Sequence, residues 1–164
     1  MNTYIICAFP GCGKTTAYES IKHRIKCIDS DSSKFHGEGM TFPDDYIAHI
    51  KENIGKVEII FASSHKEVRD ALAKEKIPFI LYFPTKNRRI EFVTNIVARG
   101  SKRDLVQKID KNFDEWVDSI ENDDNQYMQG VRLPEAGQFL GNEQGFVDLL
   151  NYILDTREKK DEQA

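Results

Sequence analysis

A glycine-rich stretch near the start of the chain has the residue types and spacing of a phosphate-binding loop. Residues 8–16 read Ala-Phe-Pro-Gly-Cys-Gly-Lys-Thr-Thr, a small residue and four free positions followed by Gly-Lys-Thr. In such a loop the glycines let the backbone curl around a phosphate, the lysine reaches the β and γ oxygens, and the first threonine hydroxyl binds Mg²⁺. We therefore expect ATP and Mg²⁺ to be bound by Gly11, Cys12, Gly13, Lys14, Thr15 and Thr16.

The flanks of this loop have the pattern that phosphate binding requires. Residues 3–8 are short, apolar and rich in strand formers, whereas residues 15–24 have helical spacing without a breaker. A strand that ends in a glycine-rich turn and enters a helix directs backbone N–H groups into one concavity, and the helix start adds partial positive charge. This context favours a phosphate site over an ordinary strand-to-helix turn.

The cysteines indicate neither a disulfide framework nor a zinc site. Cys7, Cys12 and Cys27 make an odd number and have no Cys or His partner at zinc-binding spacing. Cys12 differs from the other two because it lies among N–H groups that would favour a thiolate. We expect oxidation of Cys12 to interfere with nucleotide binding.

The elements that must position the loop alternate between strands and helices. We expect strands at residues 3–8, 25–28, 57–62, 78–83 and 127–133, and helices at residues 15–24, 44–54, 64–76, 85–99, 101–120 and 142–154. Ser64 and Glu67 have the spacing of a capping box, and Asp44 is a candidate N-cap. This alternation predicts a parallel sheet with helices on both faces, with ligands bound beyond the carboxyl ends of its strands.

Length and composition favour one soluble domain. The chain has 164 residues, 40% of them hydrophobic, and a net charge of -4, so its surface as a whole does not indicate binding to nucleic acid or to a membrane. No apolar run approaches the length of a membrane-spanning helix, which favours a cytoplasmic protein. We expect a single domain at residues 1–156 and a frayed, charged tail at 157–164.

Further candidates for chemistry follow the second, third and fourth predicted strands. Asp29 and Asp31 are suited to orienting Mg²⁺ or accepting a proton from an acceptor hydroxyl. Asp29 is the candidate metal ligand and Asp31 the candidate catalytic residue, and the sequence allows these two roles to be exchanged. Arg89 and Arg99 are suited to bidentate contact with the moving phosphoryl group. The residues that we expect at the acceptor are Asp31, Lys34, His65 and Arg69.

The loop at residues 8–16 and the sequence DSDSSKF at residues 29–35 are the stretches that carry a resemblance to known proteins. Through them the chain resembles small phage-encoded P-loop kinases of the nucleoside-monophosphate kinase and polynucleotide kinase group. The resemblance implies a three-layer α/β P-loop NTPase fold with a five-stranded parallel sheet flanked by helices. It also implies an acceptor-binding region at about residues 30–56 and an arginine-bearing lid at about 85–104. Asp29-Ser30-Asp31 is similar to the Asp-x-Asp of sugar and shikimate kinases, and Asp31 to Lys34 is similar to the Asp-x-x-Arg of polynucleotide kinases.

Absent motifs narrow the function further. The third predicted strand ends in Phe-Ala-Ser-Ser without an acidic residue, and no Asn-Lys-x-Asp occurs, which argues against motor ATPases and GTPases. No arginine lies between Asp31 and Lys56, so Lys34, Lys51 and Arg69 are the substitutes for holding an acceptor phosphate. We expect a nucleoside or deoxynucleoside monophosphate kinase with a small-molecule nucleotide acceptor and no membrane partner. The alternatives are a polynucleotide 5′-hydroxyl kinase, acting on the end of a single strand, and a non-catalytic ATP-binding regulatory protein.

Overall fold

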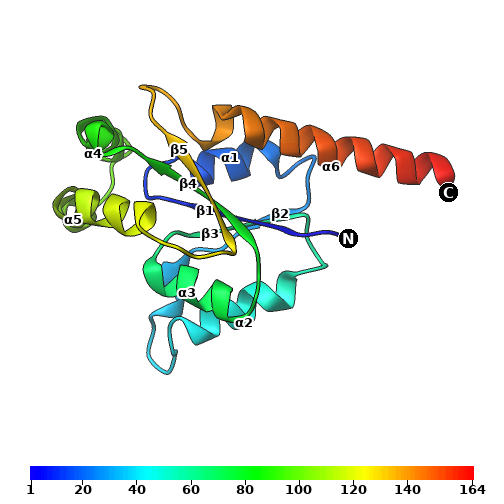
Figure 1. The fold of residues 1–164 in the computed structure, drawn as a ribbon, viewed down its shortest axis with the longest axis horizontal. Helices are drawn as coiled ribbons and strands as arrows, with labels where there is room; N and C mark the ends of the chain where they lie inside the picture. The colour runs from blue at the N-terminus through cyan, green and yellow to red at the C-terminus, as the bar shows by residue number, and fades with distance from the viewer.

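A computed structural model describes residues 1–164 and contains one five-stranded parallel sheet with the strand order β2-β3-β1-β4-β5 (Figure 1). The strands are β1 Tyr4–Ala8, β2 Cys27–Asp29, β3 Ile59–Ser63, β4 Phe79–Pro84 and β5 Met128–Leu133. The α-helices are α1 Lys14–Ile21, α2 Asp44–Asn53, α3 Lys66–Lys74, α4 Arg89–Ala98, α5 Arg103–Glu121 and α6 Gln144–Gln163. Three short 3₁₀ helices complete the chain: η1 Ser32–Phe35, η2 Lys86–Arg88 and η3 Leu140–Asn142. The predicted five-stranded parallel sheet is confirmed.

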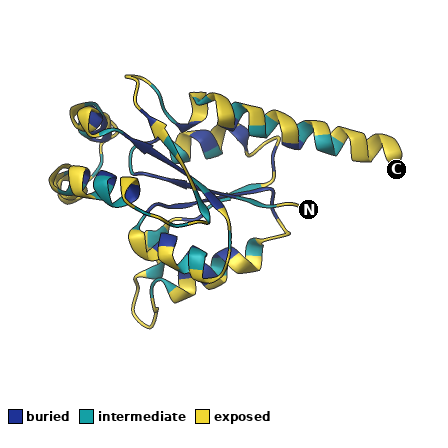
Figure 2. Ribbon diagram, in the orientation of Figure 1, coloured by how far each residue is buried: buried dark blue, intermediate teal, exposed yellow.

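Helices cover both faces of the sheet and form a three-layer arrangement. Figure 1 shows α1 and α6 on one face, α2 and α3 on the other, and α4 beside α5 at the edge where the strands end. Every residue of β3 is buried, as expected for a central parallel strand, and the exposed residues lie on the outer helix faces (Figure 2). The buried apolar side chains form a single continuous core.

An aromatic cluster attaches the phosphate loop to α4 and α5. The ring of Phe9 meets the ring of Phe113 edge to face at 5.0 Å and the ring of Phe92 at 6.4 Å. All three rings are buried, and Phe92 and Phe113 are also 5.9 Å apart. Since these contacts link the loop to both helices, they fix where the α4–α5 pair lies relative to the loop.

Several local predictions differ from the structure. The predicted capping box does not form, because His65 is the residue that precedes α3 and no side chain caps that helix. Asp44 lies inside the first turn of α2 instead of capping it, and Pro43 precedes the helix. The predicted helix at residues 85–99 divides into η2 and α4.

The charged segment at residues 157–164, which we expect to fray, is helical in the structure, because α6 continues to Gln163. Arg157 anchors this part of the helix: its Nη1 donates to the carbonyl of Arg24 at 2.8 Å, and its Nη2 pairs with the carboxylate of Glu58. A sequence pattern of charged residues cannot reveal these partners, which lie far away along the chain. None of the helices is both long and apolar enough to cross a lipid bilayer.

We predict that Phe113→Ala lowers the free energy of unfolding by about 3–5 kcal/mol, because a buried ring is removed and a cavity remains among its aromatic neighbours. Urea denaturation followed by circular dichroism measures this change. Val97→Ala is the control: Val97 is 57% exposed on α4, so its removal should change the free energy by less than about 0.5 kcal/mol. Equal effects of the two changes would contradict the role of the aromatic cluster.

Candidate active site

The phosphate loop has the backbone conformation that a bound phosphate requires. Gly11 and Gly13 both have φ of +88°, a left-handed conformation that side chains other than glycine rarely adopt. A Cβ atom at Gly11 would also lie 3.1 Å from a ring carbon of Phe92, so the packing beside the loop leaves no room for a side chain. Gly13 precedes α1 and no side chain caps the helix, which leaves the N–H groups of its first turn free to bind an anion.

Lys14, Thr15 and Asp29 converge beside this loop. The ammonium of Lys14 lies 3.4 Å from Oδ1 of Asp29, and the hydroxyl of Thr15 donates to Oδ2 of the same carboxylate at 3.3 Å. Asp29 reaches this position because it ends β2, and the carboxyl ends of parallel strands share one edge of the sheet.

The same carboxylate fits a role as a metal ligand. Oδ1 of Asp29 is buried and accepts no hydrogen bond, although it lies near a positive charge. Magnesium prefers hard oxygen ligands and keeps several of its own waters, so a carboxylate and a hydroxyl are a suitable protein contribution. Thr15 and Asp29 are therefore the residues that would hold Mg²⁺.

Asp31 lies two residues beyond Asp29 and precedes η1. Its Oδ1 accepts the backbone N–H of Ser33 at 2.9 Å, which begins η1 and holds the carboxylate in place. Burial alone would raise the pKa of the Asp31 carboxyl. Hydrogen bonds from Ser33, together with the charges of Lys14 and Lys34, outweigh burial and lower this pKa below its usual value. Asp31 is therefore an ionised hydrogen-bond acceptor at neutral pH, and a weak base.

His65 and Lys34 flank the same edge of the sheet. His65 follows β3, and its ring meets the edge of Trp116 at 6.0 Å. Burial lowers the pKa of the His65 imidazole more than the neighbouring carboxylate of Glu67 raises it, so the ring is neutral at pH 7. Lys34 is exposed in η1 and forms no ion pair, which leaves its ammonium free for an anionic ligand.

The structure corrects the acceptor role that we expected for Arg69. Its side chain is only 2% exposed and its Nε pairs with Asp123 at 2.9 Å. The remaining donors contact the carbonyl of Ser64 and both the carbonyl and the hydroxyl of Ser119. Arg69 thus joins α3 to α5, and its buried guanidinium is committed to these partners.

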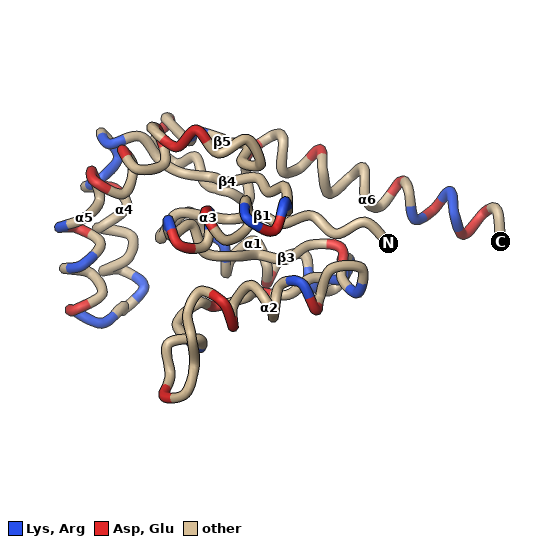
Figure 3. Tube along the Cα trace, turned by 60° about the horizontal axis from the view of Figure 1, so that its bottom comes forward, with Lys and Arg blue, Asp and Glu red and all other residues tan.

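The predicted lid arginines have separate positions. Arg89 donates to Asp110 of α5 at 2.7 Å. Acidic and basic residues are interspersed along α4 and α5 (Figure 3). Arg88, which falls in the same predicted lid, is buried: it forms an ion pair with Glu91 and stacks on the ring of Phe92 at 4.9 Å. Arg99 lies beside the glycines of the phosphate loop.

Arg99 lines a cavity of about 460 Å³ beside the loop. Glycines of the loop and Thr16 form one wall, Asn95 of α4 and Arg99 at the end of this helix form another, and residues after β5 close it. Phe139 and Asn142 of this last wall were not predicted from the sequence. A turn-rich stretch at residues 134–142 follows β5 at the edge where ligands bind, and that signal could have identified them.

The structure also corrects the expected reactivity of Cys12. The side chain points away from the phosphate side and is fully buried, with Sγ 3.6 Å from the carbonyl of Tyr82. Burial raises the pKa of this thiol far above its usual value, despite the positive charge of Arg88. The N–H groups of the loop therefore do not create a thiolate there.

Comparisons with known proteins support the fold. No protein-family model and no curated protein matches the sequence. A gluconokinase from Sinorhizobium meliloti 1021 is similar in structure, with a TM-score of 0.54 and 15% identity over 97% of both chains. A sugar kinase from Janibacter sp. HTCC2649 has a TM-score of 0.50 and 14% identity, covering 94% of this chain and 93% of its own.

The SH3-kinase fragment of tight junction protein 3 also matches, with a TM-score of 0.50 and 8% identity over 95% of this chain and 57% of the fragment. These identities are low, so the likeness concerns the fold. Together with the loop and the strand order, it shows that the chain has the three-layer α/β fold of the P-loop kinases.

We predict that Cys12 in the native protein resists alkylation by iodoacetamide at pH 8, because its thiol is buried and its pKa is raised. Peptide mass spectrometry before and after unfolding in urea measures the modified fraction at each cysteine. All three cysteines should react in the unfolded chain, which provides the control. Rapid labelling of native Cys12 would refute the buried thiol.

Proposed function

We propose that this chain is an ATP- and Mg²⁺-dependent phosphotransferase whose acceptor is a hydroxyl group held by Asp31. The observation that carries the proposal is the convergence of Lys14, Thr15 and Asp29 on the open N–H groups of α1. A cation, a hydroxyl and a carboxylate at the start of a helix supply what a Mg²⁺-bound triphosphate needs. The bound metal would supply charge neutralisation on the phosphate oxygens.

Lys14 has the position to stabilise the transferring phosphoryl group. In the structure its ammonium pairs with Asp29 at 3.4 Å, a distance long enough for phosphate oxygens to replace the carboxylate as the nearest partner. Transfer of a phosphoryl group depends mainly on positioning and on neutralisation of charge, which is the contribution expected of this lysine.

The cavity beside Arg99 supports a site for the nucleoside of the donor. Its volume of about 460 Å³ lies in the range of small-molecule sites, and it opens directly from the phosphate loop. The Arg99 guanidinium offers a planar surface for a base, and the Asn95 amide offers hydrogen bonds to its edge. Phe139 and Asn142 shape the opposite wall, because the Phe139 ring stacks on Phe92 and the Asn142 amide bonds the backbone of Phe139 and Gly137. This position favours a contact of Arg99 with the nucleoside over the contact with the moving phosphoryl group that we expected.

Asp31 is suited to orienting the acceptor. Its lowered pKa makes it a poor proton acceptor in the ground state but a good hydrogen-bond acceptor for a hydroxyl. The attacking hydroxyl needs little deprotonation in a loose transition state, so alignment by an ionised carboxylate is the useful contribution. Proton transfer to Asp31 would then follow formation of the new phosphate ester bond.

The surroundings of Asp31 favour an acceptor without a phosphate of its own. Of the three cations that could replace the missing arginine, Lys51 pairs with Glu75 at 2.9 Å and Arg69 is buried, which leaves Lys34. The similar folds of the gluconokinase and the sugar kinase support the same choice. We therefore place a small polyhydroxy acceptor first. A nucleoside monophosphate bound through Lys34 is the second candidate.

We predict that Lys14→Ala lowers kcat by about 10²–10³-fold, because a positive charge is removed from the transferring phosphoryl group. The measurement is ADP release with saturating ATP and acceptor, and circular dichroism confirms the fold. Lys74→Ala removes an exposed lysine at the end of α3 and should stay within twofold of the unchanged protein. Turnover retained in Lys14→Ala would overturn the mechanism.

The acceptor is identified by offering radiolabelled ATP with three panels: sugars and sugar acids, nucleoside monophosphates, and a 5′-hydroxyl oligonucleotide. We expect transfer to the first panel and a loss of about 10²-fold in kcat for Asp31→Asn, which keeps the shape but removes the charge. Transfer only to a monophosphate or only to the oligonucleotide would replace the proposed acceptor by the corresponding alternative. ATP binding without any transfer would support the non-catalytic alternative.

We predict that Arg99→Ala raises the KM for ATP by about 5–10-fold with little change in kcat, since a stacking cation worth about 1 kcal/mol is lost from the nucleoside cavity. Steady-state kinetics at varied ATP separates the two constants. Lys111→Ala, an exposed change on α5, is the control for a general loss of positive charge. A selective loss of kcat in Arg99→Ala would instead support contact with the phosphoryl group.

A further inference from the structure

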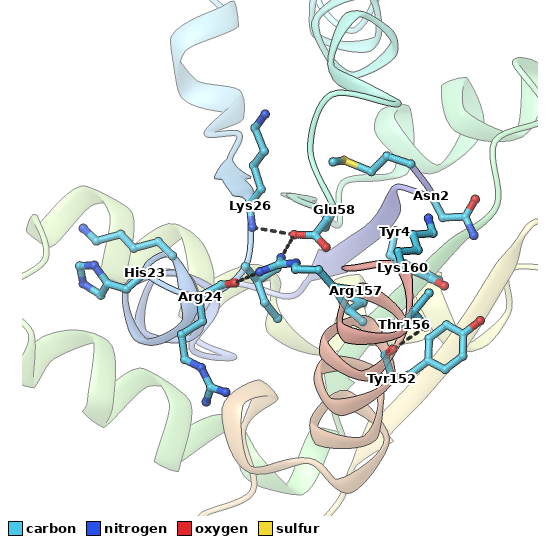
Figure 4. A pocket seen from close by; sticks show the side chains of 14 residues that line it. Asn2, Tyr4, His23, Arg24, Lys26, Glu58, Tyr152, Thr156, Arg157 and Lys160 are labelled. Carbon is cyan, nitrogen blue, oxygen red and sulfur yellow. Dashed lines mark hydrogen bonds and ion pairs between the residues drawn. The ribbon is translucent and has the colours of Figure 1, made fainter. Parts of the chain in front are cut away.

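A second large cavity lies at the opposite edge of the sheet from the phosphate loop. It has a volume of about 610 Å³ and lies at the amino ends of three strands, where Tyr4 begins β1, Lys26 precedes β2 and Glu58 precedes β3 (Figure 4). The end of α1 and the second half of α6 form its sides. The cavity therefore lies outside the candidate active site.

The cavity concentrates positive charge in a chain whose net charge is -4. Of its 14 lining residues, five are lysine or arginine and only Glu58 is acidic. The basic residues are Lys22, Arg24, Lys26, Arg157 and Lys160. Grouping like charges around a concave surface raises the local potential and favours an anionic ligand.

The single carboxylate does not neutralise this group. Glu58 is 9% exposed, accepts the backbone N–H of Lys26 at 3.0 Å, and pairs with the guanidinium of Arg157. Lys22 pairs with Glu19 at the end of α1. No carboxylate forms an ion pair with Arg24 or Lys160, so their charges are available to a ligand.

The walls of the cavity are held together by Arg157. Its side chain extends from α6 to Glu58 and to the carbonyl of Arg24, as Figure 4 shows. These contacts fix α6 against the segment that joins α1 to β2. Because the scaffold is fixed, the free cations are presented in a defined arrangement and not on a mobile tail.

Aromatic rings accompany the cations. Tyr152 is 56% exposed on α6 beside the cavity, and Tyr4 contributes a second, partly buried ring. Exposed aromatic rings among lysines and arginines are the combination that binds nucleotides, with bases stacked on the rings and phosphates held by the cations.

We propose that this cavity binds the phosphate and base of a nucleotide, either free or as part of a single strand, independently of the phosphate loop. Lys160 contacts a phosphate oxygen, and the ring of Tyr152 on the same helix carries the base. A free nucleotide and a nucleotide within a single strand offer the same base and phosphate groups to the cavity, and they differ in how many phosphates are bound.

The test uses the Lys14→Ala protein, in which the phosphate loop is disabled, and fluorescence anisotropy of a 5′-fluorescein-labelled dT8. We expect saturable binding that weakens as the salt concentration rises. A plot of the logarithm of the association constant against the logarithm of the salt concentration should have a slope of about -0.7 per phosphate contact. Lys160→Glu should weaken binding at least fivefold and reduce the slope by about 0.7. Tyr152→Ala should weaken binding at least threefold and leave the slope unchanged.

Lys159→Glu is the matched control, because it makes the same change of charge at the neighbouring exposed position of α6, which does not line the cavity. It should bind dT8 within twofold of the parent. Unlabelled dTDP distinguishes a free nucleotide from a single strand as the ligand. Displacement of labelled dT8 by dTDP at concentrations near the Kd of dTDP indicates a free nucleotide, and no displacement indicates a single strand.

Three results would overturn the proposal. The first is the absence of saturable binding of either nucleotide ligand, and the second is an equal weakening of dT8 binding by Lys159→Glu and Lys160→Glu. The third is competition with labelled dT8 by an octaglutamate peptide that equals the competition by a nucleotide ligand. Melting temperatures of all variants, followed by circular dichroism, exclude unfolding as the cause. The protein tested lacks Lys14, so an absence of dT8 binding would not contradict the proposed phosphotransferase activity. In the same way, an absence of phosphoryl transfer by the unchanged protein would not contradict binding at this cavity, because the two are measured separately.

Discussion

The left-handed backbone at Gly11 and Gly13 is the constraint on which the candidate active site depends. It turns the chain between β1 and α1 so that the first N–H groups of the helix stay without capping partners and Lys14 points toward the carboxyl ends of the strands. The aromatic contact between Phe9 and Phe113 holds this turn from the other side. The glycine conformations and this aromatic packing together fix the shape of the loop.

The sheet order explains why Asp29 can serve this loop. β2 pairs with β3, and β3 pairs with β1, so Asp29 lies two strands away from the phosphate loop. It still meets Lys14 and Thr15 because the loop begins α1, which returns across the sheet to β2. The fold thus brings Asp29 to the phosphate loop, whereas a specific function depends on the side chains that are added to this scaffold.

Features carried by local pattern could be predicted from the sequence. The glycine spacing identified the loop, the alternation of apolar runs gave a parallel sheet, and the carboxyl ends of the strands located Asp29. Long-range partners could not be predicted. Arg69 and Arg88 have the residue type of phosphate ligands, but each is buried against groups about 50 residues away in sequence. An arginine in a helical sequence pattern therefore gives no indication of whether its guanidinium faces a substrate or the protein interior.

The contacts of Arg157 have a consequence for how the chain folds. They join α6 to residues 133 and 99 positions earlier in the sequence, at the starts of β2 and β3. Contacts of such long sequence separation form only after the intervening chain has been ordered, because closing a long loop costs entropy before it gains interactions. The sheet would therefore lack the support of α6 until the preceding strands have formed, which makes docking of α6 a late step in folding.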